Sequence, residues 1–213
     1  MNETSAPAPE MSELLRIRRD KLDTLRAEGN DPYRVTRCEV TAHCAEVVEG
    51  FDRLEGQTVS LAGRIMSKRD MGKAFFCDLL DGSGRLQLYV KVDDLGEASF
   101  TRFKKFDIGD LVAVEGTVFR TRRGEISLHA ASVQLLAKSL RPLPEKFHGL
   151  QDTDLRYRQR YVDLIVNPEA RRVFRARTRI VAGIRAFLDA RGYLEAETPV
   201  LNTISGGANA RPF

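Results

Sequence analysis

An outward-facing aromatic ring among polar side chains is the first group in this sequence with an evident chemistry. The stretch "KAFFCDLLD" alternates, so either Phe75 or Phe76 must leave the apolar face. If Phe75 points inward, Phe76 points outward, beside Gln87 and Tyr89 of the following strand and Arg64 or Arg69 of the preceding one. A ring stacks on an unpaired base, an amide reads a base edge and a guanidinium holds phosphate. The alternative is that Phe76 only packs beneath the N-terminal helix.

A second candidate site lies in the final stretch, "ETPVLNTISGGANARPF". Gly206 and Gly207 let the backbone approach a ligand closely, and Arg211 could hold a carboxylate or a phosphate. No strand and helix frame the two glycines, so this pattern alone is common to many loops. The sequence contains no Walker-type nucleotide-binding loop, no HExxH metalloprotease motif and no GxSxG hydrolase motif, and the three histidines are scattered along the chain. The sequence therefore predicts no complete catalytic apparatus.

Composition bounds the class of protein. The 213 residues are 42% hydrophobic and 30% charged, which is typical of globular chains. No apolar run approaches the roughly 20 residues of a membrane span, and "MNETSAPAPEMS" lacks a secretory pattern, so we expect a cytoplasmic protein without a membrane partner. Three cysteines without paired spacing predict reduced, structural thiols rather than a metal site. Residues 156–191 hold ten arginines against three acidic residues, which suits phosphate, a partner's carboxylates or a solvated helix face.

The elements that must position these groups follow a simple order. Five segments with period-two alternation span residues 57–139, with a helix over 97–106 between the third and the fourth. Five short strands in this order, with Gly63 marking a bend or bulge in the first, predict an OB-fold β-barrel. A tail and helices precede it over residues 1–56, with one helix from Ser12 to about Glu28 and a shorter one over 41–49. The fold class is therefore α+β.

Beyond the barrel the periodicity becomes helical. Residues 140–152, which include "RPLPEKFHG", predict an ordered linker. One helix is expected from Thr153 to Val166 and a longer one from Glu169 to Arg191, with Gly192 after its end. The longer helix carries an apolar stripe that includes Ile180 and Ile184.

Three stretches together resemble the bacterial type of class II lysyl-tRNA synthetase. They are "MGKAFFCDLLDGSGRLQLYVKVDDL", "LRPLPEKFHGLQDTDLRYRQRYVDLI" and "GYLEAETPVLNTISGGANARPF". The resemblance implies an anticodon-binding OB domain over 57–139 and the beginning of a class II catalytic domain over 153–213. It implies that Arg69, Phe76, Gln87 and Glu125 contact the anticodon bases of lysine tRNA, with Phe76 as the stacking ring and the other three as polar readers. By residue pattern alone, a lone turn carboxylate such as Glu125 is more often simply solvated.

The resemblance also implies roles for the second part. The helix and "GYLEAETPVL" are similar to motif 1, which builds a homodimer interface and ends in a proline, so Ile180, Ile184 and Pro199 are expected there. Gly206 or Gly207 is expected at the edge of the lysine pocket. The activity implied is ligation of lysine to tRNA with ATP and Mg²⁺, releasing AMP and pyrophosphate.

The family's motifs 2 and 3, with the ligands of ATP and Mg²⁺, have no counterpart in these residues. We therefore expect an N-terminal portion that binds lysine tRNA weakly and does not activate lysine alone. Two other interpretations stay open: a stand-alone OB-fold module that binds tRNA or single strands without ligase activity, and a fused or paralogous lysyl-transferring enzyme.

Overall fold

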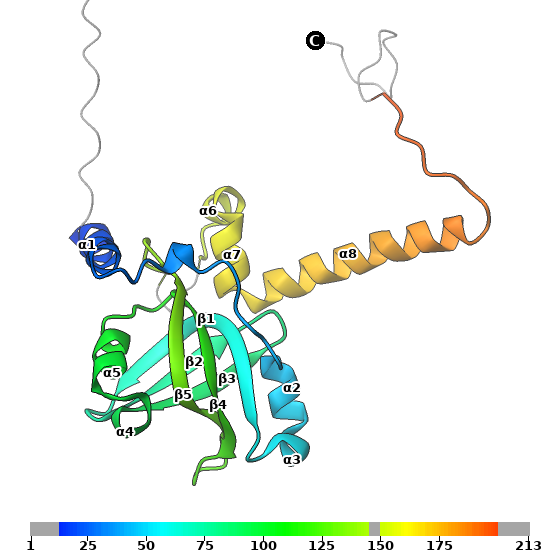
Figure 1. Ribbon diagram of the computed structural model, residues 1–213. Helices are drawn as coiled ribbons and strands as arrows, with labels where there is room; N and C mark the ends of the chain where they lie inside the picture. The colour runs from blue at the N-terminus through cyan, green and yellow to red at the C-terminus, as the bar shows by residue number, and fades with distance from the viewer. Residues whose placement is uncertain (1–12, 145–149, 200–213) are drawn as a thin grey trace, which may run out of the picture. The chain divides into compact units, whose positions relative to one another are not determined.

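The computed structural model describes residues 13–144 and 150–199, and the chain divides into two compact units, Met1–Leu143 and Pro144–Phe213 (Figure 1). Each unit is treated separately. The first contains α1 (Glu13–Ala27), the 3-10 turn η1 (Pro32–Arg34), α2 (Cys44–Glu49), α3 (Phe51–Leu54), β1 (Thr58–Asp70), β2 (Ala74–Leu80), β3 (Arg85–Lys91), α4 (Val92–Leu95), α5 (Glu97–Lys104), β4 (Leu111–Arg120) and β5 (Ile126–Ala137). The second contains α6 (Thr153–Arg158), α7 (Arg160–Val166) and α8 (Pro168–Asp189).

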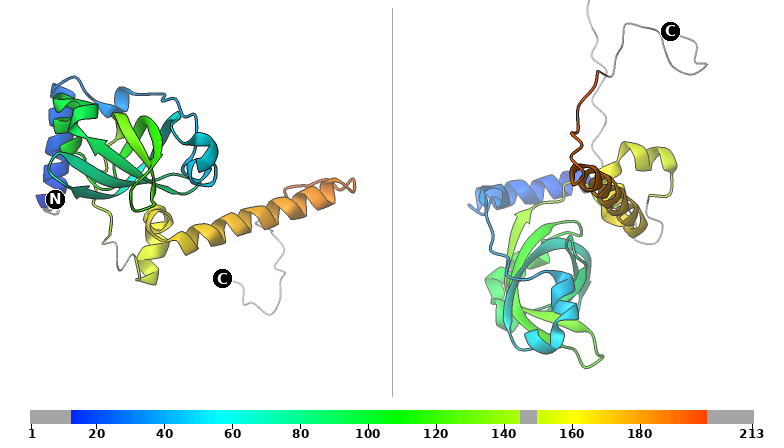
Figure 2. Two further views of the ribbon diagram at one scale, coloured as in Figure 1. Left: turned by 90° about the horizontal axis from the view of Figure 1, so that it is seen from below. Right: turned by 90° about the vertical axis from the view of Figure 1, so that its right-hand side faces the viewer.

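The five strands form a closed barrel in the order β1-β2-β3-β5-β4 (Figure 2). All neighbours are antiparallel except β3 and β5, which run parallel over Gln87–Tyr89 and Ser127–His129. The helices α4 and α5 lie between β3 and β4 along the chain. This is the architecture of an OB fold, so the predicted α+β class and barrel are confirmed.

Alternation along the strands explains the core. On β3, Leu86, Leu88 and Val90 are buried, while Gln87 and Tyr89 between them are half-buried on the outer face. Phe75 is 3% exposed and contacts Phe100 of α5 with ring centroids 5.3 Å apart, so it is the inward member of the phenylalanine pair. Phe76 consequently points outward, as the alternation predicts.

The role of Gly63 differs from the prediction. The register irregularity between β1 and β2 falls between Ile65 and Ser67, two residues beyond the glycine. At Gly63 itself a β-carbon would lie 2.8 Å from the Leu79 side chain and 2.8 Å from the Leu80 carbonyl oxygen. The glycine is therefore needed for close approach of β1 to β2, and the bulge follows it.

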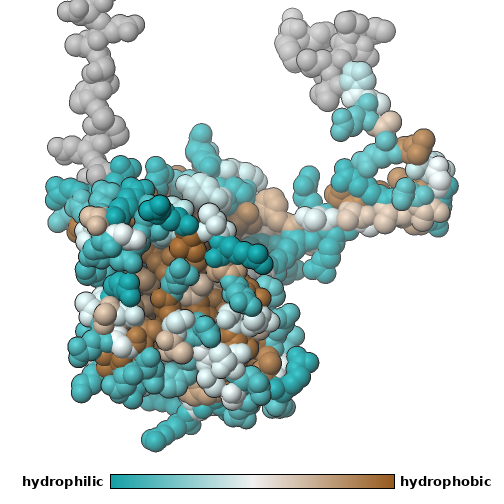
Figure 3. All heavy atoms as spheres, viewed as in Figure 1, coloured by the Kyte–Doolittle hydropathy of each residue, from teal (hydrophilic) through white to brown (hydrophobic). Residues whose placement is uncertain are grey.

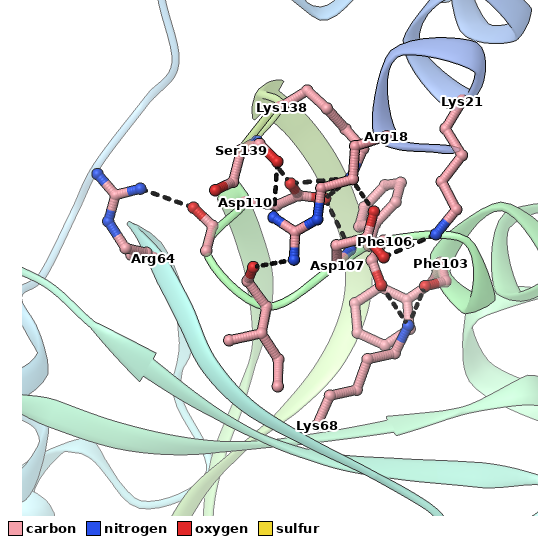
Figure 4. Close-up of polar contacts among 12 residues, drawn as sticks. Arg18, Lys21, Arg64, Lys68, Phe103, Phe106, Asp107, Asp110, Lys138 and Ser139 are labelled. Carbon is pink, nitrogen blue, oxygen red and sulfur yellow. Dashed lines mark hydrogen bonds and ion pairs between the residues drawn. The ribbon is translucent and has the colours of Figure 1, made fainter. Parts of the chain in front are cut away.

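A network of ions fastens α1 and the loop before β4 to the end of the barrel (Figure 4). The Lys138 ammonium is 1% exposed and pairs with Asp107 and with Asp110, a carboxylate that is fully buried. Lys21 of α1 pairs with Asp107 at 2.7 Å, and Arg18 donates to the Ser139 carbonyl oxygen at 2.7 Å. Burial alone would raise the pKa of Asp107, but hydrogen bonds from the two lysines outweigh it and lower that pKa. The helix is thus an integral part of the barrel unit.

The second unit begins with a correction. The single helix expected from Thr153 to Val166 is two helices, because Gln159 leaves helical geometry with φ −111° and ψ 52°. Asp163, fully buried, accepts from Arg156 at 2.9 Å and pairs with Arg160, so it ties both helices together. α8 is the long helix predicted from Glu169, and it begins one residue earlier, at a proline.

Apolar side chains on α8 are largely exposed (Figure 3). Ile180 is 63% exposed and Ile184 is 56% exposed, and Ala170 is the one buried residue among those described in the helix. Among the described residues, therefore, most of the apolar stripe of α8 stays exposed.

Candidate nucleic-acid interface

Four aromatic rings form a row across adjacent strands of the barrel. Phe76 of β2 faces Tyr89 of β3 in the register, and their centroids are 4.9 Å apart. Tyr89 in turn faces His129 of β5 at 5.2 Å. Phe119 of β4 completes the row, 5.7 Å from His129 and 6.2 Å from Tyr89. Because outward residues of paired strands are neighbours, the register brings Phe76, Tyr89 and His129 together. Phe119 lies diagonally across from His129, as the partner of Ser127.

A cavity of about 860 Å³ opens over three of these rings, Phe76, Tyr89 and Phe119. Its lining residues come from β1 to β4 and from the turns after β1 and β4, and none of those described belongs to α1. The proposal that Phe76 merely packs beneath the N-terminal helix is therefore not supported. Ligand sites of this size combine apolar walls with a few polar groups.

All four residues predicted to contact bases line this one cavity: Arg69, Phe76, Gln87 and Glu125. Arg69 is the register partner of Phe76 on β1. Gln87 lies two residues from Tyr89 on β3. Glu125 is held by a turn in which its N–H donates to the Thr121 hydroxyl at 3.0 Å and its carbonyl accepts from the Thr121 N–H at 2.9 Å. The structure thus gathers residues separated by up to 56 positions in the chain.

The side-chain amide of Gln87 is oriented by a residue of the neighbouring strand β5. Its Oε1 accepts a hydrogen bond from the Ser127 hydroxyl at 3.1 Å, and Ser127 is fully buried. With that oxygen occupied, the amide N–H₂ group is the free donor of the side chain. A free donor suits a base edge that presents a carbonyl oxygen or a ring nitrogen.

Positive charge surrounds the aromatic floor. Arg69, Lys73, Arg122 and Arg123 line the cavity, and none of them has an ion-pair partner within residues 13–144 and 150–199. Lys91 is different, because its hydrogen bond to Asp93 at 2.6 Å raises the pKa of the lysine and lowers that of the aspartate. Unpaired cations beside stacked rings match the pattern of single-strand binding surfaces, in which phosphates are held electrostatically.

Lys68 of β1 connects the strands that carry the cavity residues to the end of α5. Its ammonium donates to three carbonyl oxygens at the end of α5, those of Phe103 at 2.6 Å and of Lys104 and Phe106 at 3.0 Å (Figure 4). It also lies 4.7 Å from the ring centroid of Phe75. Burial lowers the pKa of Lys68 to about 8. The lysine therefore fixes α5 against the strands that carry Arg69 and Phe76.

Sequence reasoning misses part of the interface, namely the rings of Phe119 and His129 and the cations Arg122 and Arg123. Alternation is the available signal for the two rings, since Val118 and Leu128 are fully buried and their neighbours must face outward. Which outward residues meet is not legible in the sequence, because the parallel pairing of β3 with β5 joins distant segments.

The residues expected at a second site are placed as follows. Ile180 and Ile184 lie on the exposed stripe of α8, and Pro199 is exposed in the extended segment beyond it. Gly206 and Gly207, expected near lysine, lie outside the described residues. Within the described ranges no group of three or more His, Cys, Asp or Glu side chains is arranged to hold a metal ion.

The comparisons with known proteins assign each unit. Residues 59–136 match the OB-fold nucleic acid binding domain family, and residues 152–213 match the family of class II tRNA synthetases (D, K and N). The chain is 55% identical over 204 residues to a protein of Thermoanaerobacter pseudethanolicus named lysine–tRNA ligase, covering 96% of this chain and 41% of that protein. The chain therefore joins an OB-fold nucleic acid binding domain to a segment of a class II tRNA synthetase domain.

Relatives from other bacteria show a similar level of identity. The lysine–tRNA ligase of Clostridium tetani is 54% identical over 96% of this chain, and that of Clostridium acetobutylicum is 54% identical over 95%. The chain spans about two fifths of the length of these curated relatives. No helix among its described residues is long and apolar enough to cross a membrane.

Proposed function

We propose that the cavity on the barrel binds the unpaired anticodon bases of lysine tRNA, and that the whole protein is a lysine–tRNA ligase. The observation that carries the first part is a half-buried Phe76 ring in a cavity shared with Arg69, Gln87 and Glu125. The names of the relatives support the second part.

Each residue has a role that follows from its chemistry. The Phe76 ring stacks on one base, which contributes about 1–3 kcal/mol in comparable sites. Gln87, oriented by Ser127, donates to the edge of that base or its neighbour. Glu125 accepts from a base donor and Arg69 donates to a base acceptor, while the unpaired cations Arg122 and Arg123 hold the phosphates.

For the second unit, we propose that α8 with its exposed stripe forms the subunit interface of a homodimer, with Ile180, Ile184 and Pro199 at that interface. Gly206 and Gly207 border the site for lysine in this proposal. ATP and Mg²⁺ are the co-reactant and metal of the proposed reaction, which yields lysyl-tRNA, AMP and pyrophosphate. Because that reaction belongs to translation, we expect the protein to act in the cytoplasm.

The direct test is binding of the 213-residue chain to the anticodon stem-loop of lysine tRNA. The control is a stem-loop whose three anticodon bases are replaced by their Watson–Crick complements, since length and charge then stay constant. Removing one base interaction worth about 1.4 kcal/mol weakens binding about ten-fold, so we expect at least that discrimination. Equal affinity for both loops at matched salt would contradict the anticodon assignment and leave only electrostatic binding.

A further inference from the structure

We propose that His129, held by Asp94, is a positioning residue that sets the base-stacking ring of Phe76 through Tyr89. The inference rests on the proposed function of the Phe76 cavity and adds a residue that lies behind it.

His129 belongs to the row of four rings but is not among the residues that line the cavity. Its ring lies 5.2 Å from Tyr89 and 5.7 Å from Phe119, the two rings that form the cavity floor with Phe76. Tyr89, 4.9 Å from Phe76, is the only ring among the described residues in contact with both His129 and the stacking ring. A change at His129 therefore reaches Phe76 by way of Tyr89.

Two features fix the His129 side chain and backbone. The Nε2 atom lies 2.8 Å from an Asp94 carboxylate oxygen, which anchors the imidazole to α4, the short helix that directly follows β3. On the neighbouring strand β4, a β-carbon at Gly116 would lie 2.2 Å from the His129 carbonyl oxygen. Only glycine at position 116 therefore permits this close approach of β4 to β5. The ring thus has a defined position from which to support its neighbours.

The physical reason for support is orientation. A phenylalanine ring on the outer face of a strand can turn about its side-chain bonds, and a base stacks on it only in a narrow range of ring planes. Contact with Tyr89 restricts that range, and Tyr89 is restricted in turn by His129 and Phe119. Removing the imidazole leaves space into which Tyr89 can turn, so Phe76 loses its preorganised position.

The experiment is a double-mutant cycle on anticodon stem-loop binding with His129→Ala and Phe76→Ala. Loss of the His129–Tyr89 pair, the one that leads to Phe76, predicts that His129→Ala weakens binding roughly three- to ten-fold. If His129 acts through Phe76, the same substitution in the Phe76→Ala background changes affinity less than about two-fold. His129→Phe keeps a ring at this position and is expected to recover most of the affinity.

Asp94→Ala gives a second arm, because it keeps the imidazole and frees it from α4. We expect it to weaken binding by a smaller factor than His129→Ala, about two- to three-fold, and it serves as the test if His129→Ala does not fold. Wild-type affinity in both variants, while Phe76→Ala binds weakly, overturns the positioning role alone. An equal loss from His129→Ala with and without Phe76 also overturns it. Unchanged binding by Phe76→Ala instead overturns the proposed function.

Discussion

The barrel and α8 both carry apolar residues at regular spacing, yet these residues are buried in the barrel and exposed in α8. In the barrel, inward residues such as Leu61, Leu88 and Val112 are fully buried. In α8, Ile180 and Ile184 lie on an equally regular stripe and remain more than half exposed. Spacing decides which residues share a face, and burial depends on whether another element covers that face.

The difference lies in where the covering element comes from. Each strand of the barrel finds both neighbours within residues 58–137, so the sheet closes on its own core. α8 belongs to a segment that matches a synthetase family domain, and the chain spans about two fifths of its curated relatives. The proposed subunit interface would supply the missing cover.

The largest expected effect comes from making the same substitution at two isoleucines, one in the barrel and one in α8. Ile65 of β1 is fully buried and Ile184 of α8 is 56% exposed. Ile65→Ala should lower the free energy of unfolding of the barrel by about 2–5 kcal/mol, because it leaves a cavity in a packed core. The matched substitution Ile184→Ala should change the local stability of α8 by less than about 0.5 kcal/mol. Native-state hydrogen exchange measures both values, at the strand amides for Ile65→Ala and at the α8 amides for Ile184→Ala; a comparable loss in the two variants would show that protein covers the stripe of α8.

A smaller effect concerns two largely buried carboxylates, one in each unit. Burial alone would raise the pKa of Asp81, but hydrogen bonds from Cys44, Ser83 and Gly84 outweigh it and lower the value from 3.8 to about 2. The stabilisation is therefore complete above about pH 4 and is lost as the pH falls towards 2. Asp81→Asn should cost the barrel about 1 kcal/mol at pH 7, because solvent screens part of the effect, and the difference from the wild type should shrink below pH 4.

Asp163→Asn is the matched variant in the second unit. Its carboxylate binds Arg156, Arg160 and Asn167, all of that unit. We expect faster amide exchange in α6 and α7 and an unchanged unfolding curve for the barrel.

For Asp81, a loss of stability in Asp81→Asn that did not vary between pH 2 and pH 7 would contradict the account. The hydrogen bonds to the Asp81 carboxylate could then not be the source of its lowered pKa.

The smallest expected effect separates the arginines of the two regions. Removing one cation that neutralises a phosphate of a single strand reduces the salt dependence of binding by about 0.7 in the log–log slope. Replacing Arg122 and Arg123 with alanine should therefore reduce that slope by about 1.4 for the anticodon stem-loop. Replacing the exposed Arg177 and Arg179 of α8 removes the same charge and should leave the slope unchanged. Equal changes in both double variants would mean that net charge, rather than the cavity, governs binding.

Alternation makes much of the barrel predictable. It indicates the five strands, the inward residues of β3 and the outward position of Phe76, because a half-buried strand imposes a strict period of two. The same reasoning places Gln87 and Tyr89 of β3 and either Arg64 or Arg69 of β1 near Phe76, and the register pairs Phe76 with Arg69 and Tyr89.

Long-range pairing and local capping limit the rest. The Tyr89 and His129 contact depends on a parallel pairing between segments 40 residues apart, which no local pattern encodes. The register irregularity beyond Gly63 and the break at Gln159 depend on how neighbouring elements pack and hydrogen-bond. Sequence alternation indicates which face a residue occupies, and only the assembled sheet shows what that residue meets.

The most direct test of the central claim is the affinity of Phe76→Ala for the anticodon stem-loop of lysine tRNA at matched salt. Phe76→Leu is the companion variant, because it keeps apolar bulk and removes the flat ring. Both are expected to lose about 1–3 kcal/mol of binding free energy, with an unchanged unfolding curve for the barrel. A dissociation constant equal to that of the wild type in both variants would show that Phe76 does not stack on a base.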